Sequence, residues 1–429
     1  MHLFLLLAAC VAPEVELADV TPPHGGGEDP DEQEDLPDAE PVEEHEPTVT
    51  REEAPAFDDS DLAGWLFTLD TVHTVELTIP VESQAALGTA PYAWAEADVT
   101  IDGEPMESVG VRLRGKIGSY RTLGGKPKFK ISFGEFVDGQ RFYGLKELSL
   151  NNAVVDCSYV REVVGYRVYE AAGVPMLRTS YARVSVNGAD YGLYVLLETP
   201  NDRWLAHNYA DPTGNLYDGK YVWYGGYSYT LLDFGNGVDG LYQLEEGRDV
   251  GNADIAAVSS ALYSTYGTSD FYATMGEVLD WDNFHRYTAV DQLLGHVDGY
   301  SMNTNNYRVY FDPADGKADL LPWDLDYSFL QDWQWGLSWG SPAGNLTYAC
   351  WVDAAVCQAK HRARVAEVLT AFEAVDWNSF LDEVEALTWT HTQTDPRREC
   401  AAADVQPTRD YVRAWLAARP AELRAYWGL

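Results

Sequence analysis

Apolar and polar residues alternate in several short segments between residues 70 and 200, which is the pattern of half-buried β-strands. The pairs Asp102-Gly103 and Asn187-Gly188 stand between such segments and are typical of two-residue hairpin turns. We therefore expect an antiparallel sheet in this part of the chain. Its strands are predicted at 75–80, 97–101, 109–114, 128–133, 145–152, 184–186 and 194–197.

Helical periodicity interrupts the strands once and dominates the later part of the chain. Asp156 and Ser158 are candidate N-caps for a helix that ends at Gly173. Its apolar stripe consists of Val160, Val163, Val164, Val168 and Ala171. Later helices are predicted at 252–266, 281–294, 361–372, 377–387 and 408–426. One helix thus accompanies the sheet, and a mostly helical region follows it.

A further hairpin is predicted near residue 315. The segments 307–311 and 318–322 read as its two strands, and the sequence Asp-Pro-Ala-Asp-Gly at 312–316 supplies the turn. A hairpin returns the end of its second strand to the start of its first. The residues that immediately precede and follow this hairpin are therefore expected to meet.

Acidic and amide side chains stand at both ends of this hairpin. Asp298 is followed five residues later by Asn303, and Asp324 and Asp326 follow the second strand. Carboxylates brought together repel one another unless a cation lies between them. Such a donor set suits Mg²⁺, which takes few protein ligands and leaves room for phosphate oxygens. A calcium-stabilised or merely solvated acidic hairpin is the alternative interpretation of this spacing.

Basic residues gather in one window of the chain. Between Ser108 and Gly134 there are seven Lys or Arg residues and no Asp or Glu. Glycines in the same window let backbone amides approach an anion closely. Alternation along 128–133 places Lys128 and Lys130 on the face opposite the core. The window predicts an anion-binding surface, with a solvated strand face as the alternative.

The chain as a whole is strongly acidic, with a net charge of −39 over 429 residues. Residues 11–61 contain 19 acidic residues against Arg51 alone, are rich in Pro and Gly, and predict a disordered, extended stalk. This charge makes nucleic acid or an anionic membrane surface an unfavourable general partner. Residues 1–10, MHLFLLLAAC, resemble a bacterial lipoprotein signal with a lipid-modified Cys10, although no Lys or Arg precedes the apolar run. An extracytoplasmic, lipid-anchored protein is therefore expected.

Four further cysteines fit two disulfides in such a compartment. Cys350 and Cys357 are close enough in sequence to close one loop, which leaves Cys157 with Cys400. A zinc site is the alternative, but no CxxC or Cys/His spacing supports it. His285 and His296 are candidate ligands, although a lone histidine is more often packed or at the surface.

Several of these motifs together resemble the CotH kinase family of secreted atypical kinases. The resemblance rests on Asp298 to Asn306, on the PWDLD segment at 322–326, and on the basic pattern R-x-R-G followed by K-x-x-x-K-I-x-F. The D-x-x-x-x-N spacing before a strand pair and a metal-type Asp is similar to a protein-kinase catalytic loop. The His-Arg and Phe-Gly neighbours of an ordinary kinase are absent. The resemblance implies an α+β, atypical protein-kinase-like bilobal fold. Its N-lobe would be an antiparallel sheet with one helix at 65–200, and its C-lobe a mostly helical region at 201–429.

The resemblance also implies roles for individual residues. Asp298 would orient or deprotonate a substrate hydroxyl. Asn303 and Asp324 would hold Mg²⁺ or Mn²⁺, with Asp326 as a second metal ligand or an N-cap. Lys130, Lys126 and Arg114 are predicted to contact the nucleotide phosphates, and Lys128 remains an alternative to Lys130. Glu162 would position the lysine, and Glu198 would lie near the adenine.

The predicted function is ATP- and Mg²⁺-dependent phosphoryl transfer to Ser, Thr or Tyr hydroxyls of extracytoplasmic or surface proteins. A non-enzymatic surface lipoprotein or adhesin that keeps a kinase-like fold is the first alternative. A carbohydrate-active protein with Asp298 and Asp324 as paired carboxylates is the second, but it leaves the basic strand unexplained.

Overall fold

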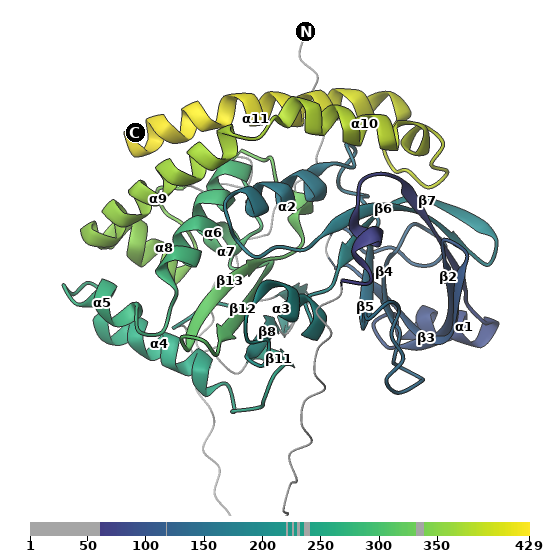
Figure 1. Ribbon diagram of the computed structural model, residues 1–429, viewed down its shortest axis with the longest axis horizontal. Coiled ribbons are helices and arrows are strands. Elements are labelled where there is room, and N and C mark those ends of the chain that lie inside the picture. Colours follow the sequence, from purple (N-terminus) through teal and green to yellow (C-terminus); the bar gives the residue numbers. More distant parts are fainter. Residues whose placement is uncertain are drawn as a thin grey trace, which may run out of the picture. The chain divides into compact units, whose positions relative to one another are not determined.

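The first seven strands close into a barrel in the order β1-β2-β3-β4-β5-β7-β6 (Figure 1). Their bounds are β1 Val72–Thr78, β2 Ala95–Ile101, β3 Glu104–Arg114, β4 Lys128–Ser132, β5 Glu147–Asn151, β6 Thr179–Val186 and β7 Ala189–Glu198. All neighbouring pairs are antiparallel except β1 and β6, which run parallel. The structure is a computed structural model that describes residues 61–116, 118–219, 222–224, 227–229, 232–235, 241–331 and 339–429. The predicted signal segment 1–10 and nearly all of the predicted stalk lie outside these residues.

This barrel differs from the predicted antiparallel sheet in two respects. The sheet has no open edge, because β1 pairs with β6 along residues 72–77 and 181–186. Periodicity reveals which residues face inward but not which distant strands pair, so closure was not predictable. Two helices, not one, accompany the barrel: α1 (Val81–Thr89) and α2 (Arg161–Ala171). Helix α1 buries only Ser83 and Leu87, so it lacks the apolar stripe by which a helix is recognised.

The barrel has its own apolar core. Side chains on the inner face of β4, including Phe129 and Ile131, are fully buried in it. The opposite face of β4 is buried as well, since Lys128 and Lys130 are also enclosed. This strand therefore does not face solvent on either side, and its lysines point toward the second part of the fold.

The predicted hairpin is present and belongs to a second sheet, ordered β11-β8-β12-β13. Strand β12 spans Tyr307–Asp312 and β13 spans Lys317–Pro322, with Tyr307 paired to Pro322. Strands β8 (Asn215–Gly219) and β11 (Tyr242–Glu246) extend the sheet. Figure 1 shows the hairpin at the centre of the fold, between the barrel strands and the C-terminal helices. A separate short pair is formed by β9 (Val222–Tyr224) and β10 (Tyr227–Tyr229).

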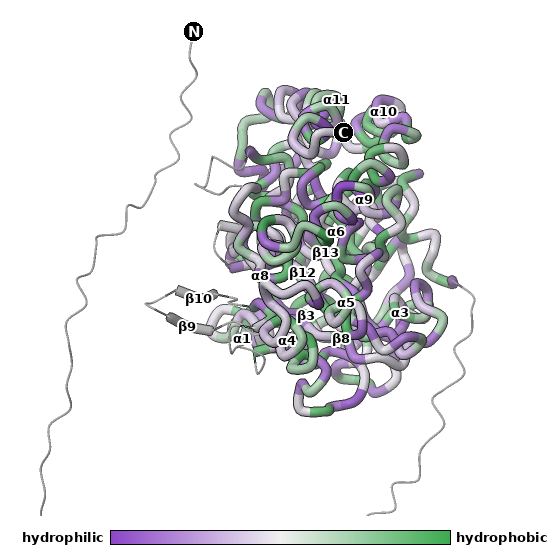
Figure 2. The backbone as a smooth tube through the Cα atoms, turned by 90° about the vertical axis from the view of Figure 1, so that its left-hand side faces the viewer, coloured by the Kyte–Doolittle hydropathy of each residue, from purple (hydrophilic) through white to green (hydrophobic). Residues whose placement is uncertain are grey.

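Nine further α-helices lie in the described part of the chain after residue 200. Their bounds are α3 Asp202–Asn208, α4 Ala253–Thr265, α5 Phe271–Met275, α6 Trp281–Leu294, α7 Tyr300–Asn303, α8 Asn345–Tyr348, α9 Ala355–Glu373, α10 Trp377–Gln393 and α11 Val405–Trp427. Helices α10 and α11 lie side by side, and hydrophilic and hydrophobic segments alternate along both (Figure 2). In the described part of the chain, no helix combines the length and the apolar character needed to span a bilayer.

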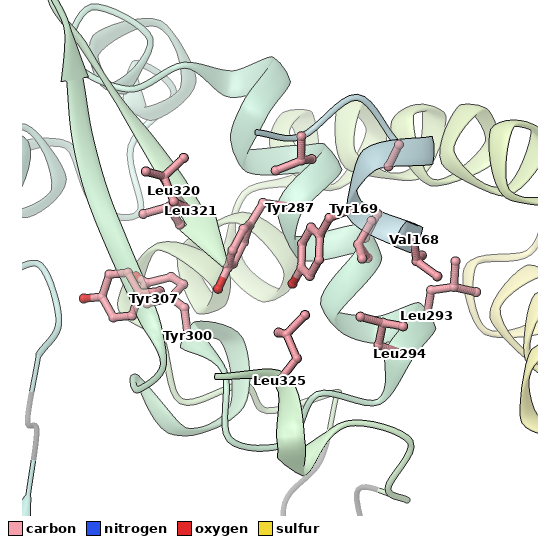
Figure 3. Close-up of a cluster of buried hydrophobic side chains, with 14 of the residues drawn as sticks. Val168, Tyr169, Tyr287, Leu293, Leu294, Tyr300, Tyr307, Leu320, Leu321 and Leu325 are labelled. Carbon is pink, nitrogen blue, oxygen red and sulfur yellow. The ribbon is translucent and has the colours of Figure 1, made fainter. Parts of the chain in front are cut away.

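A large apolar core joins α2 to the hairpin and to α6. In Figure 3, Tyr169 of α2 and Tyr287 of α6 lie side by side, near Tyr300, Leu321 and Leu325. The two tyrosine ring centroids are 5.6 Å apart. This packing fixes the helix of the N-terminal part against the elements that bear the acidic residues.

Two disulfides are present, Cys157–Cys400 and Cys350–Cys357, as the sequence indicated. The first joins the segment before α2 to the segment before α11, across 243 residues. The second closes a short loop at the start of α9.

The mixed α+β class is confirmed by these helices and strands, while the boundary between two lobes near residue 200 stays a prediction.

Candidate functional site

The site begins where α6 ends. The Asp280 carboxylate caps the start of this helix by accepting hydrogen bonds from the backbone amides of Asp282 (2.7 Å) and Asn283 (3.2 Å). At the other end, Gly295 adopts φ +60°, a left-handed conformation that terminates the helix and suits glycine. The chain then turns through His296 toward Asp298, so the helix determines where that carboxylate lies.

Three asparagine side chains hold the Asp298 carboxylate. Oδ1 accepts hydrogen bonds from the amides of Asn303 (2.6 Å) and Asn305 (3.2 Å), and Oδ2 accepts one from Asn306 (2.9 Å). Burial raises the pKa of Asp298, the asparagines oppose that shift, and the negative charge of Asp324 adds to it. Asp298 and Asn303 are therefore brought together as predicted, and Asp324 is close enough to influence them.

Asp324 follows β13 in a left-handed conformation, with φ 46° and ψ 72°. A non-glycine residue in this region is strained, and such strain persists only where the surroundings enforce it. Helix α2 packs against the next residue, Leu325: a Cβ at residue 165 would lie 2.9 Å from a Leu325 methyl group. The mid-helix glycine therefore allows α2 to approach the segment that follows Asp324.

Lys128 faces this carboxylate from the barrel. Its Nζ atom lies 3.0 Å from both Asp324 oxygens and 2.9 Å from an Asp326 oxygen, and the side chain is only 1 % exposed. Burial alone would lower the pKa of Lys128, but the charges of Asp324 and Asp326 raise it, so the ammonium stays charged. Burial would likewise raise the pKa of Asp324, whereas Lys128 and Arg114 hold it below its ordinary value. Burial and the Asp324 charge raise the pKa of Asp326 to about 7.

Arginines extend the basic surface next to Lys128. Arg114 lies opposite Lys128 in the β3–β4 register, and its guanidinium stacks over Trp323 at 4.7 Å. Arg308 of β12 contacts the same ring at 4.4 Å and pairs with Asp218. Within the described ranges, Arg114 has no carboxylate partner within ion-pair distance. Its charge acts on Asp324 and Glu162 at longer range, where it lowers the pKa of both carboxyl groups against the opposing effect of burial.

Lys130 and Lys126 are placed differently from the prediction. Lys130 pairs with Glu147 of β5 at 2.8 Å, and it is Lys128, the alternative left open by the alternation, that contacts Asp324. Lys126 is enclosed at 1 % exposure by Asp395 (2.6 Å) and the Leu193 carbonyl (2.7 Å). The buried ion pair with Asp395 indicates a structural role for Lys126, and its assignment as a phosphate contact stays a prediction.

Glu162 and Glu198 also have definite partners. Glu162 of α2 is buried, accepts a hydrogen bond from the Asn151 amide, and has its pKa raised first by burial and then by the Asp324 charge. It lies close enough to Lys128 for the two charges to interact, but it is the Asn151 amide that binds it. Glu198 ends β7, and its two carboxylate oxygens accept hydrogen bonds from Nε (2.9 Å) and Nη2 (2.7 Å) of Arg178. A role for Glu198 near an adenine stays a prediction.

A buried polar network supports the loop from below. Asp291 of α6 accepts hydrogen bonds from Tyr169 (2.6 Å) and Ser301 (2.9 Å), and burial raises its pKa to about 7. It thus ties α2 to α7 close to Gly299, the residue that follows Asp298. His296 is fully buried beside it, with its pKa lowered by burial to about 4. Sequence reasoning missed Asp291 because it reads as one more polar residue on a helix.

The oxygen donors of this site suit a hard divalent cation. Asn303, Asp324 and Asp326 offer only oxygen donors, which Mg²⁺ and Mn²⁺ prefer. Among the described residues, the oxygens of Asp298, Asp324 and Asp326 do not all come within 4.8 Å of one another. Mg²⁺ needs only one or two protein carboxylates alongside phosphate and water, so this spread is compatible with it.

Comparison with known proteins places these residues in a family. The family model described as CotH kinase protein matches residues 111–423, well over half of the chain. Invasin CotH2 of Rhizopus delemar is 22% identical over 304 residues, covering 67% of this chain and 48% of that protein. Inner spore coat protein H of Bacillus subtilis is 22% identical over 214 residues, covering 48% of this chain and 56% of that protein. The chain spans about half the length of each relative.

Solved structures give weaker similarities. The HipA–HipB–operator DNA complex of Shewanella oneidensis matches with a TM-score of 0.34 and 11% identity, over 83% of this chain and 73% of that chain. The proinflammatory kinase CtkA of Helicobacter pylori matches with a TM-score of 0.29 and 9% identity, over 76% and 87%. At TM-scores this low, neither similarity establishes a shared fold.

Proposed function

The chain belongs to the CotH kinase protein family, and from that membership together with the site we propose that it transfers the γ-phosphoryl group of ATP to protein hydroxyls. One observation above all supports the proposal. Lys128 of the barrel bonds both oxygens of Asp324, while Asp298 and Asn303 lie next to that pair. A barrel strand and the two ends of a distant hairpin thus bring a cation and oxygen donors together, as phosphoryl transfer requires.

The nucleotide phosphates would occupy the side of the site where the basic residues lie. Lys128 would exchange part of its contact with Asp324 for a phosphate oxygen, and Arg114 would supply a second positive charge. Asp324 and Asn303 would hold a divalent cation, with Asp326 as a further donor. That cation would neutralise the charge of the phosphate oxygens. Glu162 would limit how far the Lys128 ammonium can move. Most of the rate enhancement would come from placement and charge stabilisation.

Asp298 would act on the acceptor. Its carboxylate is oriented by three amides and would accept a hydrogen bond from the attacking hydroxyl. The hydroxyl oxygen forms a bond to the γ-phosphorus, the bond from that phosphorus to the β,γ-bridging oxygen breaks, and ADP leaves. The hydroxyl proton passes to Asp298 or to water. The acceptor class is a protein Ser, Thr or Tyr side chain.

The test is label transfer from γ-labelled ATP with Mg²⁺ by the full-length chain, with casein as a general acceptor. Asp298→Ala and Asp324→Ala should abolish labelling. Asp315→Ala is the matched control, because Asp315 lies in the exposed turn at the far end of the same hairpin. Equal labelling by all four proteins would remove the assignment.

A non-enzymatic surface protein is the second candidate. It is favoured by the names of the two relatives, an invasin and an inner spore coat protein, and by the contact of Lys128 with both oxygens of Asp324. Nucleotide with metal should raise the melting temperature of a kinase by binding the folded state, whereas a pure adhesin should not respond. Attachment through a lipid on Cys10 belongs to the proposal under either function, and Cys10→Ser should release the chain from the membrane fraction.

A further inference from the structure

Two histidines and two cysteines meet in the helical part of the fold, away from the site described above. Cys350 lies in the segment Ala349–Asp353, Cys357 and His361 are one turn apart on α9, and His285 comes from α6. All four side chains are buried, His285 being 3% exposed and the others 0%. One ring nitrogen of His285 and the two sulfur atoms all lie within 4.8 Å of one another. The His285 and His361 ring centroids are 5.4 Å apart.

The histidines lack the hydrogen bonds that buried imidazoles normally make. Within the described ranges, neither ring nitrogen of His361 has a hydrogen-bond partner, and Nδ1 of His285 has none either. The other nitrogen of His285, Nε2, lies 3.4 Å from the Tyr272 hydroxyl. A buried polar group without a partner costs about 1–3 kcal/mol. Two such imidazoles beside two sulfurs therefore indicate a missing ligand.

We propose that His285, Cys350, Cys357 and His361 bind a Zn²⁺ ion when the two cysteines are thiols. This part of the fold would then be cross-linked either by the disulfide or by the metal ion. Two thiolates and two neutral imidazoles are the donor set of tetrahedral structural zinc sites. Cys350 and Cys357 form a disulfide in the structure, and the thiol form is the state in which the chain is synthesised. Sequence spacing did not reveal the site, because His285 lies on a different helix from His361.

The surroundings suit a structural site. Trp351 and Trp427 contact the His361 ring, with centroids 5.0 and 4.9 Å away. Trp281 stacks on His285 at 5.2 Å and 15°. The Tyr272 hydroxyl near Nε2 would orient His285 so that Nδ1 is the ligand, as groups behind zinc-bound histidines do. An enclosed aromatic pocket leaves no open position for a substrate, so the ion would stabilise the packing of α6 against α9.

The chemistry balances in two steps. A dithiol reductant opens the Cys350–Cys357 bond: the two sulfurs take up two electrons and two protons, and the dithiol becomes a disulfide. Zn²⁺ then forms two bonds to sulfur and two to nitrogen, and the two thiol protons leave to solvent. A disulfide oxidant reverses the sequence: it takes two electrons from the two thiolates and two protons from solvent and becomes a dithiol, the Cys350–Cys357 bond re-forms, and the ion is released.

Co²⁺ is the probe, because its spectrum reports tetrahedral thiolate coordination. The full-length chain, reduced with a phosphine, should bind one Co²⁺ with intense visible bands and a thiolate-to-cobalt charge-transfer band, and Zn²⁺ should displace it. The oxidised chain should show neither band. His285→Gln and His361→Gln should each weaken binding by at least about a hundredfold, the upper end of the range for groups that only support a ligand.

Two controls keep the result interpretable. The double variant Cys157→Ser/Cys400→Ser removes the other disulfide and should bind Co²⁺ like the reduced wild type. His207→Gln changes an exposed histidine on α3 and should have no effect. Octahedral cobalt spectra, equal binding by the oxidised chain, or unchanged affinity in both ligand-histidine variants would each overturn the proposal. If a histidine variant fails to fold, as judged by far-ultraviolet circular dichroism, the comparison of reduced with oxidised wild type decides.

Discussion

The ammonium of Lys128 lies 3.0 Å from each carboxylate oxygen of Asp324, although 196 positions separate the two residues. The pair joins a barrel strand to the end of the β12–β13 hairpin. Each partner keeps the other charged despite burial, because the charge of Lys128 lowers the pKa of Asp324 and the charge of Asp324 raises the pKa of Lys128. The predictions below follow from this pair and from the residues around it.

Lys128→Met should reduce phosphoryl transfer by roughly 10²- to 10³-fold, the range for removing one preorganised group from a transition-state site. Lys130→Met is the matched control on the same strand and face, and it should retain most of the activity because Lys130 pairs with Glu147. Initial rates of label transfer at saturating ATP measure both. The opposite ranking would return the nucleotide-binding role to Lys130, as the sequence had indicated.

Asp298→Asn should slow phosphoryl transfer without weakening the binding of ATP and Mg²⁺. Loss of the hydroxyl-orienting carboxylate is expected to lower the transfer rate by about 10²- to 10⁴-fold, while the thermal shift caused by ATP with Mg²⁺ should persist. Asp324→Asn should remove both the activity and the Mg²⁺-dependent part of the shift, since Asp324 is the proposed metal ligand. If Asp298→Asn abolished the shift instead, Asp298 would be a ligand and not the group that acts on the acceptor.

Lys126→Met should destabilise the fold by about 3–5 kcal/mol, because it leaves the buried carboxylate of Asp395 without its counter-ion. That carboxylate also accepts hydrogen bonds from the Tyr159 hydroxyl (2.9 Å) and the Leu193 amide (3.1 Å). Urea unfolding of Lys126→Met, Asp395→Asn and the double variant measures the coupling between the two residues. A Lys126→Met protein of normal stability that no longer bound ATP would show that Lys126 contacts phosphate after all.

The pH dependence of stability should include a contribution from Asp319 of β13. Burial raises its pKa to about 7, although the Tyr209 hydroxyl donates a hydrogen bond to it at 2.9 Å. The folded state therefore holds a proton that the unfolded state releases near pH 4, and the resulting stabilisation is lost as pH rises to about 7. The difference in the free energy of unfolding between Asp319→Asn and the wild type should therefore shift by roughly 2 to 4 kcal/mol in favour of the variant as pH rises from about 4 to 7.

Comparing the two proteins cancels the other titrating groups, such as the buried histidines. Denaturant unfolding at several pH values provides the measurement. A constant difference between Asp319→Asn and the wild type across that range would show that this carboxyl titrates at its ordinary pKa in the folded protein.

Local features of the fold were predictable where one element decides them. The β12–β13 hairpin and α6 occur where the pattern placed them, because alternation, turn residues and helical periodicity act over a few neighbours. The link from Asp298 to Asn303 is equally local. Barrel closure was not predictable, since the parallel pairing of β1 with β6 depends on strands about a hundred residues apart.

The sequence by itself determined which residue types were available to the site: an Asp and an Asn before a hairpin, two Asp after it, and a strand with alternating lysines. Only the tertiary structure decided that Lys128 contacts Asp324, that Lys126 is enclosed by Asp395, and that His285 approaches the Cys350–Cys357 disulfide. The physical reason is that alternation defines the face of a strand but not the register at which that face meets another element. Which ammonium reaches which carboxylate is settled by the packing of distant segments, and this packing has no signature in the local pattern.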